Sequence, residues 1–295
     1  MDLVVSISTQ HSEMLQQNPW AARLIEDSVT FDDWKKHLRE FELLNNRFIS
    51  FIQTSESQNQ DSYSMPQMWL FSRPSHPVPV CVLESEFELM MCHRDKVVFD
   101  IDLVKILRKQ FPKAHVLTLH EPFAGQWKEV AQGMGYLDHV SLTTHLYKVD
   151  QDTLTKIEEP QFYFKKIERL DREVYRSIEG FIRETMRKRV KKDEVNRSYQ
   201  KHCFYGLFHR GRLLSIAAKT RSIPNARCIS YVYTPPELRG RAYARVLVSQ
   251  MAQDILEKES VQTVFLYADQ SNPSSNRLYQ NLGFQKVCGC VTFVS

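Results

Sequence analysis

The chain has 295 residues, of which 42% are hydrophobic and 25% are charged, and its formal net charge is +4. This length predicts two domains, and the composition is that of a globular protein with a buried core, which excludes long disordered regions. The mild positive charge falls short of that of a dedicated nucleic-acid binder, and no apolar stretch approaches the ~20 residues that span a bilayer. Because the first residues also lack a basic segment ahead of their short apolar run, we expect a cytoplasmic location without membrane or nucleic-acid partners.

The first half of the chain predicts helices followed by a meandering sheet. Apolar residues at helical spacing, among them Phe31, Trp34 and Leu38, predict helices over the first sixty residues. The later pattern predicts strands at 68–72, 80–85 and 88–93, with a proline-punctuated turn before the second, then a helix at 102–110, a strand at 115–122, a helix at 125–136 and a strand at 140–149. A polar segment at 151–161 follows and reads as a linker.

The second half repeats this outline, which predicts mixed α/β architecture in two similar lobes. The pattern predicts strands at 162–167, 203–209, 213–220, 228–234, 263–269 and 286–294, and helical regions at 171–201, 240–259 and 273–282. Gly211, in the corner from His209 to Arg212, accepts positive φ and predicts a hairpin there.

Six cysteines lie mostly in apolar, strand-like runs, without the paired spacing of a structural zinc site: Cys81, Cys92, Cys203, Cys228, Cys288 and Cys290. Cys288 and Cys290 would project from the same face of a strand, which is a poor ligand pair unless two further donors lie nearby. We therefore expect buried free thiols and no metal.

A strand, a turn of small residues and a helix follow one another between residues 228 and 259. Such a turn leaves the first backbone N–H groups of the helix unpaired, and the helix dipole favours an anion there. The turn consists of Arg239, Gly240, Arg241, Ala242, Tyr243 and Ala244. Its arginines can donate charge-assisted hydrogen bonds to phosphate oxygens. We expect a pyrophosphate cradle, and an ordinary connection with exposed arginines is the alternative.

The turn resembles the coenzyme A motif of the GNAT acyltransferase superfamily, Gln/Arg-x-x-Gly-x-Gly/Ala, with Ala242 where glycine is usual. Downstream, the stretch from Asn272 to Phe284 resembles the Asn-to-Tyr-to-Gly-Phe signature of that superfamily, with Tyr279 seven residues after Asn272. The likeness is specific across about 217–284. It implies a GNAT fold and a cosubstrate that is acetyl-coenzyme A or another acyl-coenzyme A, without a metal.

The chain as a whole looks like two-lobed bacterial GNAT proteins and, more distantly, like glycine N-acyltransferases. The resemblance implies two tandem GNAT-like lobes, at 1–150 and 162–295, joined by the linker. The turn from His93 to Lys96 lacks the glycine-rich pattern, so the first lobe is expected to be degenerate and the second to carry catalysis.

The resemblance also implies residue roles. Asn272, together with Asn276, would contact the pantetheine or phosphate arm, and Tyr279 would protonate the departing thiolate. A backbone N–H around Val232 and Tyr233 could stabilise the tetrahedral oxyanion, and a phenol with a pKa of about 10 is a workable acid. The alternatives are that Tyr279 only packs its ring on the sheet and that Asn272 only caps a helix.

The general base is not assigned, because the strand at 228–234 carries no carboxylate. His202 and Asp269 are weak candidates, and Glu237 lies too close to the phosphate turn. The basic run from Arg187 to Lys192 could attract an acidic acceptor or could be a solvated helix end.

These features together predict an N-acyltransferase that moves an acetyl group to a primary amine of a small molecule or amino acid by direct attack in a ternary complex. A non-catalytic acyl-coenzyme A sensor or interaction module is the rival, because of Ala242 and the missing base. An alanine costs little there if its φ is helical, but it would crowd the phosphates if its φ is positive.

Overall fold

The structure, a computed structural model, describes residues 21–24, 68–73, 76–84, 88–91, 99–186 and 189–295. The helices predicted before residue 67 and the turn at His93 to Lys96 lie outside the described residues, except that 21–24 forms a strand. The chain divides into two compact units, here called unit 1 (Met1–Thr143 with Gly289–Ser295) and unit 2 (Thr144–Cys288).

In the described residues of unit 1, a sheet and two helices share one hydrophobic core. Its elements are β1 (Ala21–Leu24), β2 (Met68–Arg73), β3 (His76–Glu84), β4 (Glu88–Met91), α4 (Ile101–Gln110), β5 (Val116–His120), α5 (Phe123–Ala131) and the end of β12 (Gln285–Val294). The strand order is β1-β2-β3-β4-β5-β12, and among these neighbours only β4 and β5 are parallel. Trp127 of α5 and Leu103 of α4 are fully buried in the core.

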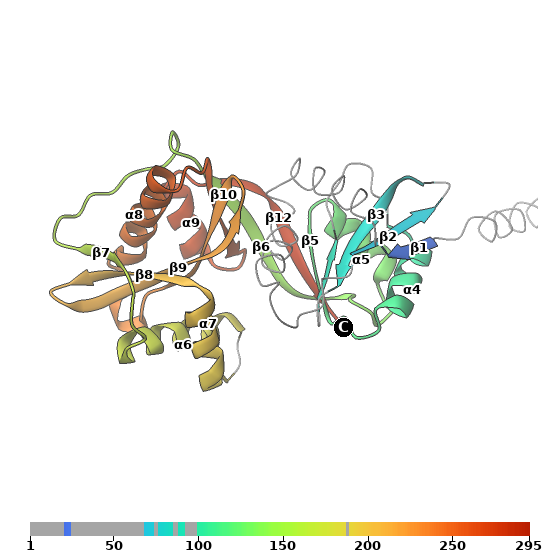
Figure 1. The fold of residues 1–295 in the computed structure, drawn as a ribbon, viewed down its shortest axis with the longest axis horizontal. Coiled ribbons are helices and arrows are strands. Elements are labelled where there is room, and N and C mark those ends of the chain that lie inside the picture. The colour runs from blue at the N-terminus through green and yellow to red at the C-terminus, as the bar shows by residue number, and fades with distance from the viewer. Residues whose placement is uncertain (1–20, 25–67, 74–75, 85–87, 92–98, 187–188) are drawn as a thin grey trace, which may run out of the picture. The chain divides into compact units, whose positions relative to one another are not determined.

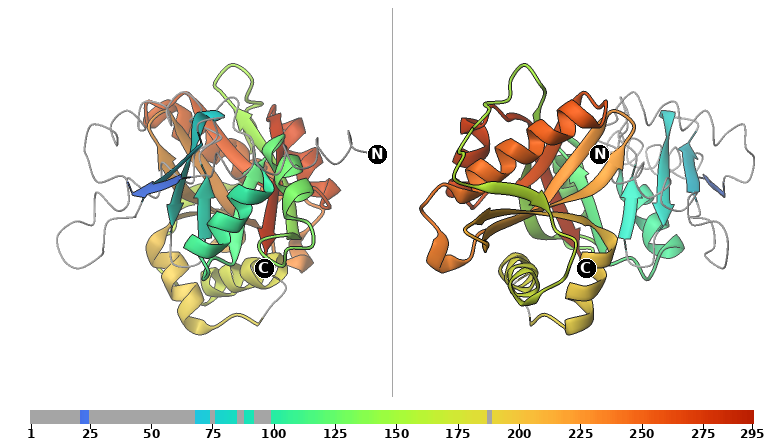
Figure 2. Two further views of the ribbon diagram at one scale, coloured as in Figure 1. Left: turned by 90° about the vertical axis from the view of Figure 1, so that its right-hand side faces the viewer. Right: turned by 60° about the vertical axis from the view of Figure 1, so that its left-hand side comes forward.

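Unit 2 repeats that strand pattern with helices on both faces of its sheet (Figures 1 and 2). Its elements are most of β6 (His139–Val149), then β7 (Tyr163–Lys166), α6 (Arg172–Met186), α7 (Lys192–Lys201), β8 (Cys203–His209), β9 (Arg212–Ile223), β10 (Ala226–Tyr233), the short 3-10 helix η1 (Pro236–Leu238), α8 (Tyr243–Lys258), β11 (Thr263–Asp269) and α9 (Pro273–Asn281). The order is β6-β11-β10-β9-β8-β7, and only β10 and β11 are parallel neighbours. One core lies between the sheet and α8 with α9, and another lies under α6 and α7.

The closing strand of each unit comes from the other half of the sequence. Residues Thr144–Val149 of β6 pair antiparallel with β11, whereas Cys290–Val294 of β12 pair antiparallel with β5. The units therefore differ from the predicted domains, because the boundary expected at 150 and the linker at 151–161 both fall inside unit 2. Strand pattern alone does not show which sheet a strand joins.

Most predicted elements are present, with local differences. Strand β3 begins at His76, so Pro77 and Pro79 lie within a strand and not in the predicted turn. In the β8–β9 hairpin, Arg210 and Gly211 have φ of 49° and 81°, which confirms the predicted left-handed turn. The region predicted as helical at 171–201 forms two helices, α6 and α7.

Four cysteines have described side chains, and none of them forms a disulfide. Cys228 and Cys290 are buried, as predicted, while Cys203 and Cys288 are only half-buried. Among the helices that the structure describes, none has both the length and the apolar character needed to cross a bilayer.

Candidate active site

Strands β10 and β11 diverge at the centre of unit 2. Their parallel pairing runs from Ala226 with Thr263 to Cys228 with Phe265, yet the strands continue to Tyr233 and Asp269. A register shift against β9 interrupts the same part of β10, where Tyr231 has φ of 54°. Because a bulge bends a strand, the second half of β10 turns away from β11 and leaves its backbone edge available for a ligand.

The predicted cradle follows directly after this divergence. Helix α8 starts at Tyr243, and the backbone N–H of Val246 donates to the carbonyl of Ala242 at 3.1 Å. Among the described residues no side chain caps this end, so the first N–H groups of α8 have no side-chain acceptor there. A Cβ built on Gly240 would meet nothing within 4 Å, so the φ of 77° at Gly240, and not crowding, is what favours glycine there.

Ala242 adopts a left-handed backbone conformation, which favours glycine. Its φ is 60° and its ψ is 11°, and it is the N-cap residue of α8. An L-residue other than glycine in this left-handed region carries a strain of about 1–2 kcal/mol. Of the two cases considered from the sequence, the structure shows the one with a positive φ, which costs more for alanine than for glycine.

The two arginines of the turn have different surroundings. Arg241 is exposed and makes no hydrogen bond or ion pair with any residue in the described part of the chain. Arg239 instead contacts Glu184 of α6 through Nη2, with distances of 2.9 Å and 2.7 Å to the two carboxylate oxygens. Of the two arginines, only Arg241 is therefore available to bind a phosphate group, because Arg239 already has an anionic partner.

Tyr279 of α9 lies in the core, close to the divergence. Its side chain is 6% exposed, with the ring packed 6.2 Å from Tyr147 of β6, and its hydroxyl has no hydrogen-bond partner among the described residues. Burial raises the pKa of Tyr279 well above its usual range, with a smaller contribution from nearby Cys228. The phenol therefore stays protonated at neutral pH, as a proton donor must be, although burial also makes it a weaker acid.

The asparagines at the start of α9 have structural partners. Asn272 is the N-cap, and its Oδ1 accepts from Ser275 N at 3.1 Å. The Asn276 Nδ2 donates to the carbonyls of Asp269 (2.8 Å) and Asn272 (2.7 Å). The Asn276 Oδ1 accepts from the Tyr147 hydroxyl at 2.9 Å and lies 3.2 Å from a ring nitrogen of His145. These contacts saturate the amide of Asn276, which leaves it little capacity for the predicted cofactor contact.

The candidate bases differ in availability. The Asp269 Oδ1 accepts from both the backbone N–H and the hydroxyl of Ser271 at 2.8 Å, an ordinary strand-end turn. Burial lowers the pKa of His202 to about 4, with further lowering by the charges of Lys201 and Arg221. The Nδ1 of His202 is buried without a partner in the described residues, so the imidazole is neutral but weakly basic.

Two residues near the site were missed from the sequence. Glu184 approaches the cradle from α6, 55 residues before Arg239, and Tyr147 reaches α9 from β6. A search for carboxylates on β10 could not find Glu184. The one sequence feature that bears on Glu184 is Gly180, which comes four residues earlier and therefore lies on the same face of the predicted helix.

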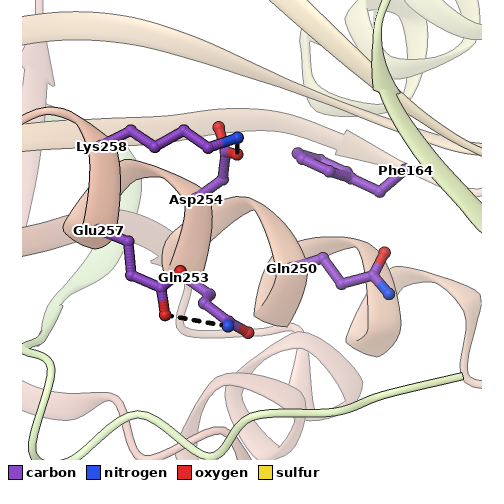
Figure 3. Close-up of a pocket in the computed structure, with 6 residues that line it drawn as sticks. All are labelled: Phe164, Gln250, Gln253, Asp254, Glu257 and Lys258. Carbon is purple, nitrogen blue, oxygen red and sulfur yellow. Dashed lines mark hydrogen bonds and ion pairs between the residues drawn. The ribbon is translucent and has the colours of Figure 1, made fainter.

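A hollow lies between the later turns of α8 and Phe164 of β7 (Figure 3). It is lined by Phe164, Gln250, Gln253, Asp254, Glu257 and Lys258. Its two carboxylates already have partners, since Asp254 pairs with Lys258 and Glu257 accepts from Gln253 and Lys156 at 3.0 Å each. It therefore offers no unpaired charge to a ligand.

Comparisons with known families and structures bear on the fold of the chain. A sequence model of the family described as "FR47-like protein" matches residues 204–292, which run from β8 into β12. No curated protein sequence matches the chain.

Three solved structures illustrate the structural likeness. A Drosophila protein has a TM-score of 0.60 at 12% identity and covers 93% of this chain and 98% of its own. A GCN5-related N-acetyltransferase from Kribbella flavida has a TM-score of 0.54 at 14% identity, with 85% and 95% covered. A tandem GNAT protein from the clavulanic acid biosynthesis pathway has a TM-score of 0.52 at 12% identity, with 94% and 98% covered. The chain therefore has the GNAT fold, as the sequence motifs predicted.

Proposed function

We propose that this protein is an acyl-coenzyme A dependent N-acyltransferase that moves an acetyl group from acetyl-coenzyme A to a primary amine of a small molecule or amino acid. One observation carries the proposal: the uncapped start of α8, preceded by left-handed Gly240 and Ala242, lies directly after the divergence of β10 from β11. Together they form an anion cradle next to an open strand edge.

Each part of this arrangement has a task in acyl transfer. The first N–H groups of α8 and the guanidinium of Arg241 would hold the diphosphate. The unpaired edge of β10 at Val232 and Tyr233 would bind the pantetheine amides and donate an N–H to the oxyanion that forms when the amine attacks the thioester. Tyr279, protonated and buried beside the divergence, would donate a proton to the departing thiolate.

The first lobe is proposed to be degenerate. Its helix α4 occupies the place in the strand order that α8 has in unit 2, but Asp100 caps it by accepting from Leu103 N at 2.8 Å. Asp100 also pairs with Arg73 at 2.7 Å. A carboxylate at this helix start would repel a pyrophosphate, which supports placing catalysis in unit 2 alone.

A non-catalytic acyl-coenzyme A sensor is the second candidate, and the left-handed φ of Ala242 favours it. A methyl group beside the cradle would weaken cosubstrate binding or change which cosubstrate is bound, without affecting any chemical step. Tyr279→Phe separates the two readings, because an enzyme would lose turnover and keep its affinity for the cosubstrate, whereas a sensor would be unaffected.

The first test is isothermal titration of the full-length protein with acetyl-coenzyme A and with free coenzyme A. Micromolar binding that Arg241→Ala weakens would support the cradle and justify a screen of amines for thiol release. If neither acetyl-coenzyme A nor longer acyl chains bind, the proposed function is wrong.

A further inference from the structure

Arg239 is fixed to the protein at three points. Besides the two contacts of its Nη2 with Glu184, its Nε donates to the carbonyl of Thr234 at 2.9 Å. Its guanidinium also lies 5.5 Å from the ring centroid of Tyr233, within reach of a cation–π interaction. An arginine with a carboxylate, a carbonyl and an aromatic ring as partners is a structural anchor and not an unoccupied ligand.

Glu184 receives contacts from two parts of the candidate site. Besides Arg239 of the loop, the hydroxyl of Tyr233 at the end of β10 donates to Glu184 Oε1 at 3.3 Å. The Tyr233 ring packs against Gly180, one helical turn before Glu184, where an added Cβ would come 2.4 Å from the Tyr233 hydroxyl. The missing side chain at Gly180 therefore makes room for the tyrosine that reaches the carboxylate.

From these contacts we propose that Glu184 is a positioning residue, which holds the loop 239–242 in its phosphate-binding shape through Arg239 and leaves Arg241 as the arginine that binds phosphate. The consequence for cosubstrate affinity rests on the proposed function. The shape of the ligand-free loop does not depend on it.

A role of Arg239 as a phosphate ligand predicts the opposite change in coenzyme A affinity. If Arg239 were itself a phosphate ligand, Glu184 would compete for it, and neutralising Glu184 would tighten coenzyme A binding. In the positioning role, neutralising Glu184 loosens the loop and weakens binding. Loss of Arg239 has a larger effect, because it leaves the Glu184 carboxylate uncompensated beside the bound phosphates.

Titration of the full-length protein with free coenzyme A at one fixed salt concentration decides between the roles. We expect Glu184→Gln to weaken binding about two- to fivefold, the range that a half-exposed ion pair supports. Arg239→Ala weakens it more, and adding Glu184→Gln to Arg239→Ala restores part of the loss. Tighter binding by Glu184→Gln would overturn the proposal, as would fully additive effects of the two substitutions.

A matched control comes from another ion pair of similar exposure. Lys156 and Glu257 have side chains 43% and 40% exposed, compared with 47% and 43% for Arg239 and Glu184. Glu257→Gln should leave coenzyme A affinity unchanged, because Glu257 lies in the last turns of α8 and Lys156 lies between β6 and β7, so neither belongs to the loop 239–242. Weakening by Glu257→Gln equal to that of Glu184→Gln would overturn the proposed local role.

Amide hydrogen exchange in the ligand-free protein tests the inference independently of the proposed function. We expect Glu184→Gln to speed exchange at residues 239–246 severalfold and Glu257→Gln to leave it unchanged. If the wild-type protein binds no coenzyme A, the proposed function fails while this measurement still tests the anchor. Unchanged exchange at 239–246 in Glu184→Gln would overturn the positioning role even if coenzyme A binds.

Discussion

The backbone N–H of Phe284 donates to the carbonyl of Tyr279 at 3.0 Å, and their rings lie 5.9 Å apart, edge to face. Gly283 also donates to the carbonyl of Gln280 at 3.0 Å, and its φ is 87°. These two bonds and the ring contact form a Schellman motif that ends α9. The Gly-Phe of the sequence signature therefore fixes the helix turn that carries Tyr279.

Gly283→Ala should be among the most destabilising substitutions in the chain. A Cβ there would lie 1.8 Å from the carbonyl oxygen of Thr153, in addition to the strain of a positive φ. We expect a loss of more than about 3 kcal/mol in the free energy of unfolding, because backbone on both sides must move. Chemical denaturation monitored by circular dichroism measures it.

Gly211→Ala is the matched control for that prediction. Gly211 has φ of 81° but open space around a built Cβ, so only the left-handed strain of about 1–2 kcal/mol applies. Equal losses for the two alanine variants would show that the approach of Thr153 is not a constraint.

Ala242→Gly should improve the cradle. Glycine removes about 1–2 kcal/mol of left-handed strain from the folded state. It also lowers stability by about 0.5–1 kcal/mol, because the unfolded chain gains conformational freedom. We expect stability to rise by up to about 1.5 kcal/mol and coenzyme A to bind severalfold more tightly, as measured by denaturation and titration.

Ala244→Gly provides the comparison, since Ala244 lies within the first turn of α8, where glycine costs about 1 kcal/mol. Weaker coenzyme A binding by Ala242→Gly than by the wild type would mean that the alanine methyl contributes to the cradle and does not crowd it.

His202 should make unfolding depend on pH in mildly acidic solution. Its pKa falls from about 6.5 in the unfolded chain to about 4 in the folded one, mainly through burial. Between these values the unfolded state binds the extra proton, so this contribution to stability is complete above about pH 6.5 and is lost as pH falls toward 4. We expect His202→Gln to reduce the difference in unfolding free energy between pH 7 and pH 5.

Urea denaturation at the two pH values gives that difference directly. If His202→Gln shows the same difference between the two pH values as the wild type does, His202 titrates in the folded protein much as it does in the unfolded chain.

Local patterns in the sequence predicted much of the fold. Period and breaker residues located α4, α8, α9 and most strands, whereas the role of Tyr279 follows from the resemblance to the superfamily signature and stays a prediction. These elements depend on neighbours within a few residues, which a sequence displays directly.

Features that depend on long-range pairing were not predictable in the same way. The approach of Glu184 to Arg239 joins residues 55 apart, and no periodic signal links them. The left-handed φ of Ala242 could be stated only as one of two alternatives. The exchange of β6 and β12 was missed because both strands have the pattern of a closing strand, and either could complete either sheet.

That exchange predicts which fragment of the chain folds alone. A fragment of residues 162–295 lacks β6, whose Leu146, Tyr147 and Val149 are 0–1% exposed in unit 2. It would lose their burial, worth about 1.5–3 kcal/mol for each large apolar side chain, and would leave Asn276 without the Tyr147 hydroxyl. Such a loss approaches the whole stability of a domain of this size.

A fragment of residues 144–288 corresponds to unit 2 and keeps Thr144–Val149, the part of β6 that pairs with β11. We expect it to unfold cooperatively on heating and to bind coenzyme A, whereas 162–295 should be aggregated or only partly folded. Calorimetry and the dispersion of amide signals in NMR spectra distinguish the two. Equal melting temperatures for both fragments would contradict the exchange, because β11 would then need no antiparallel partner from residues 144–149.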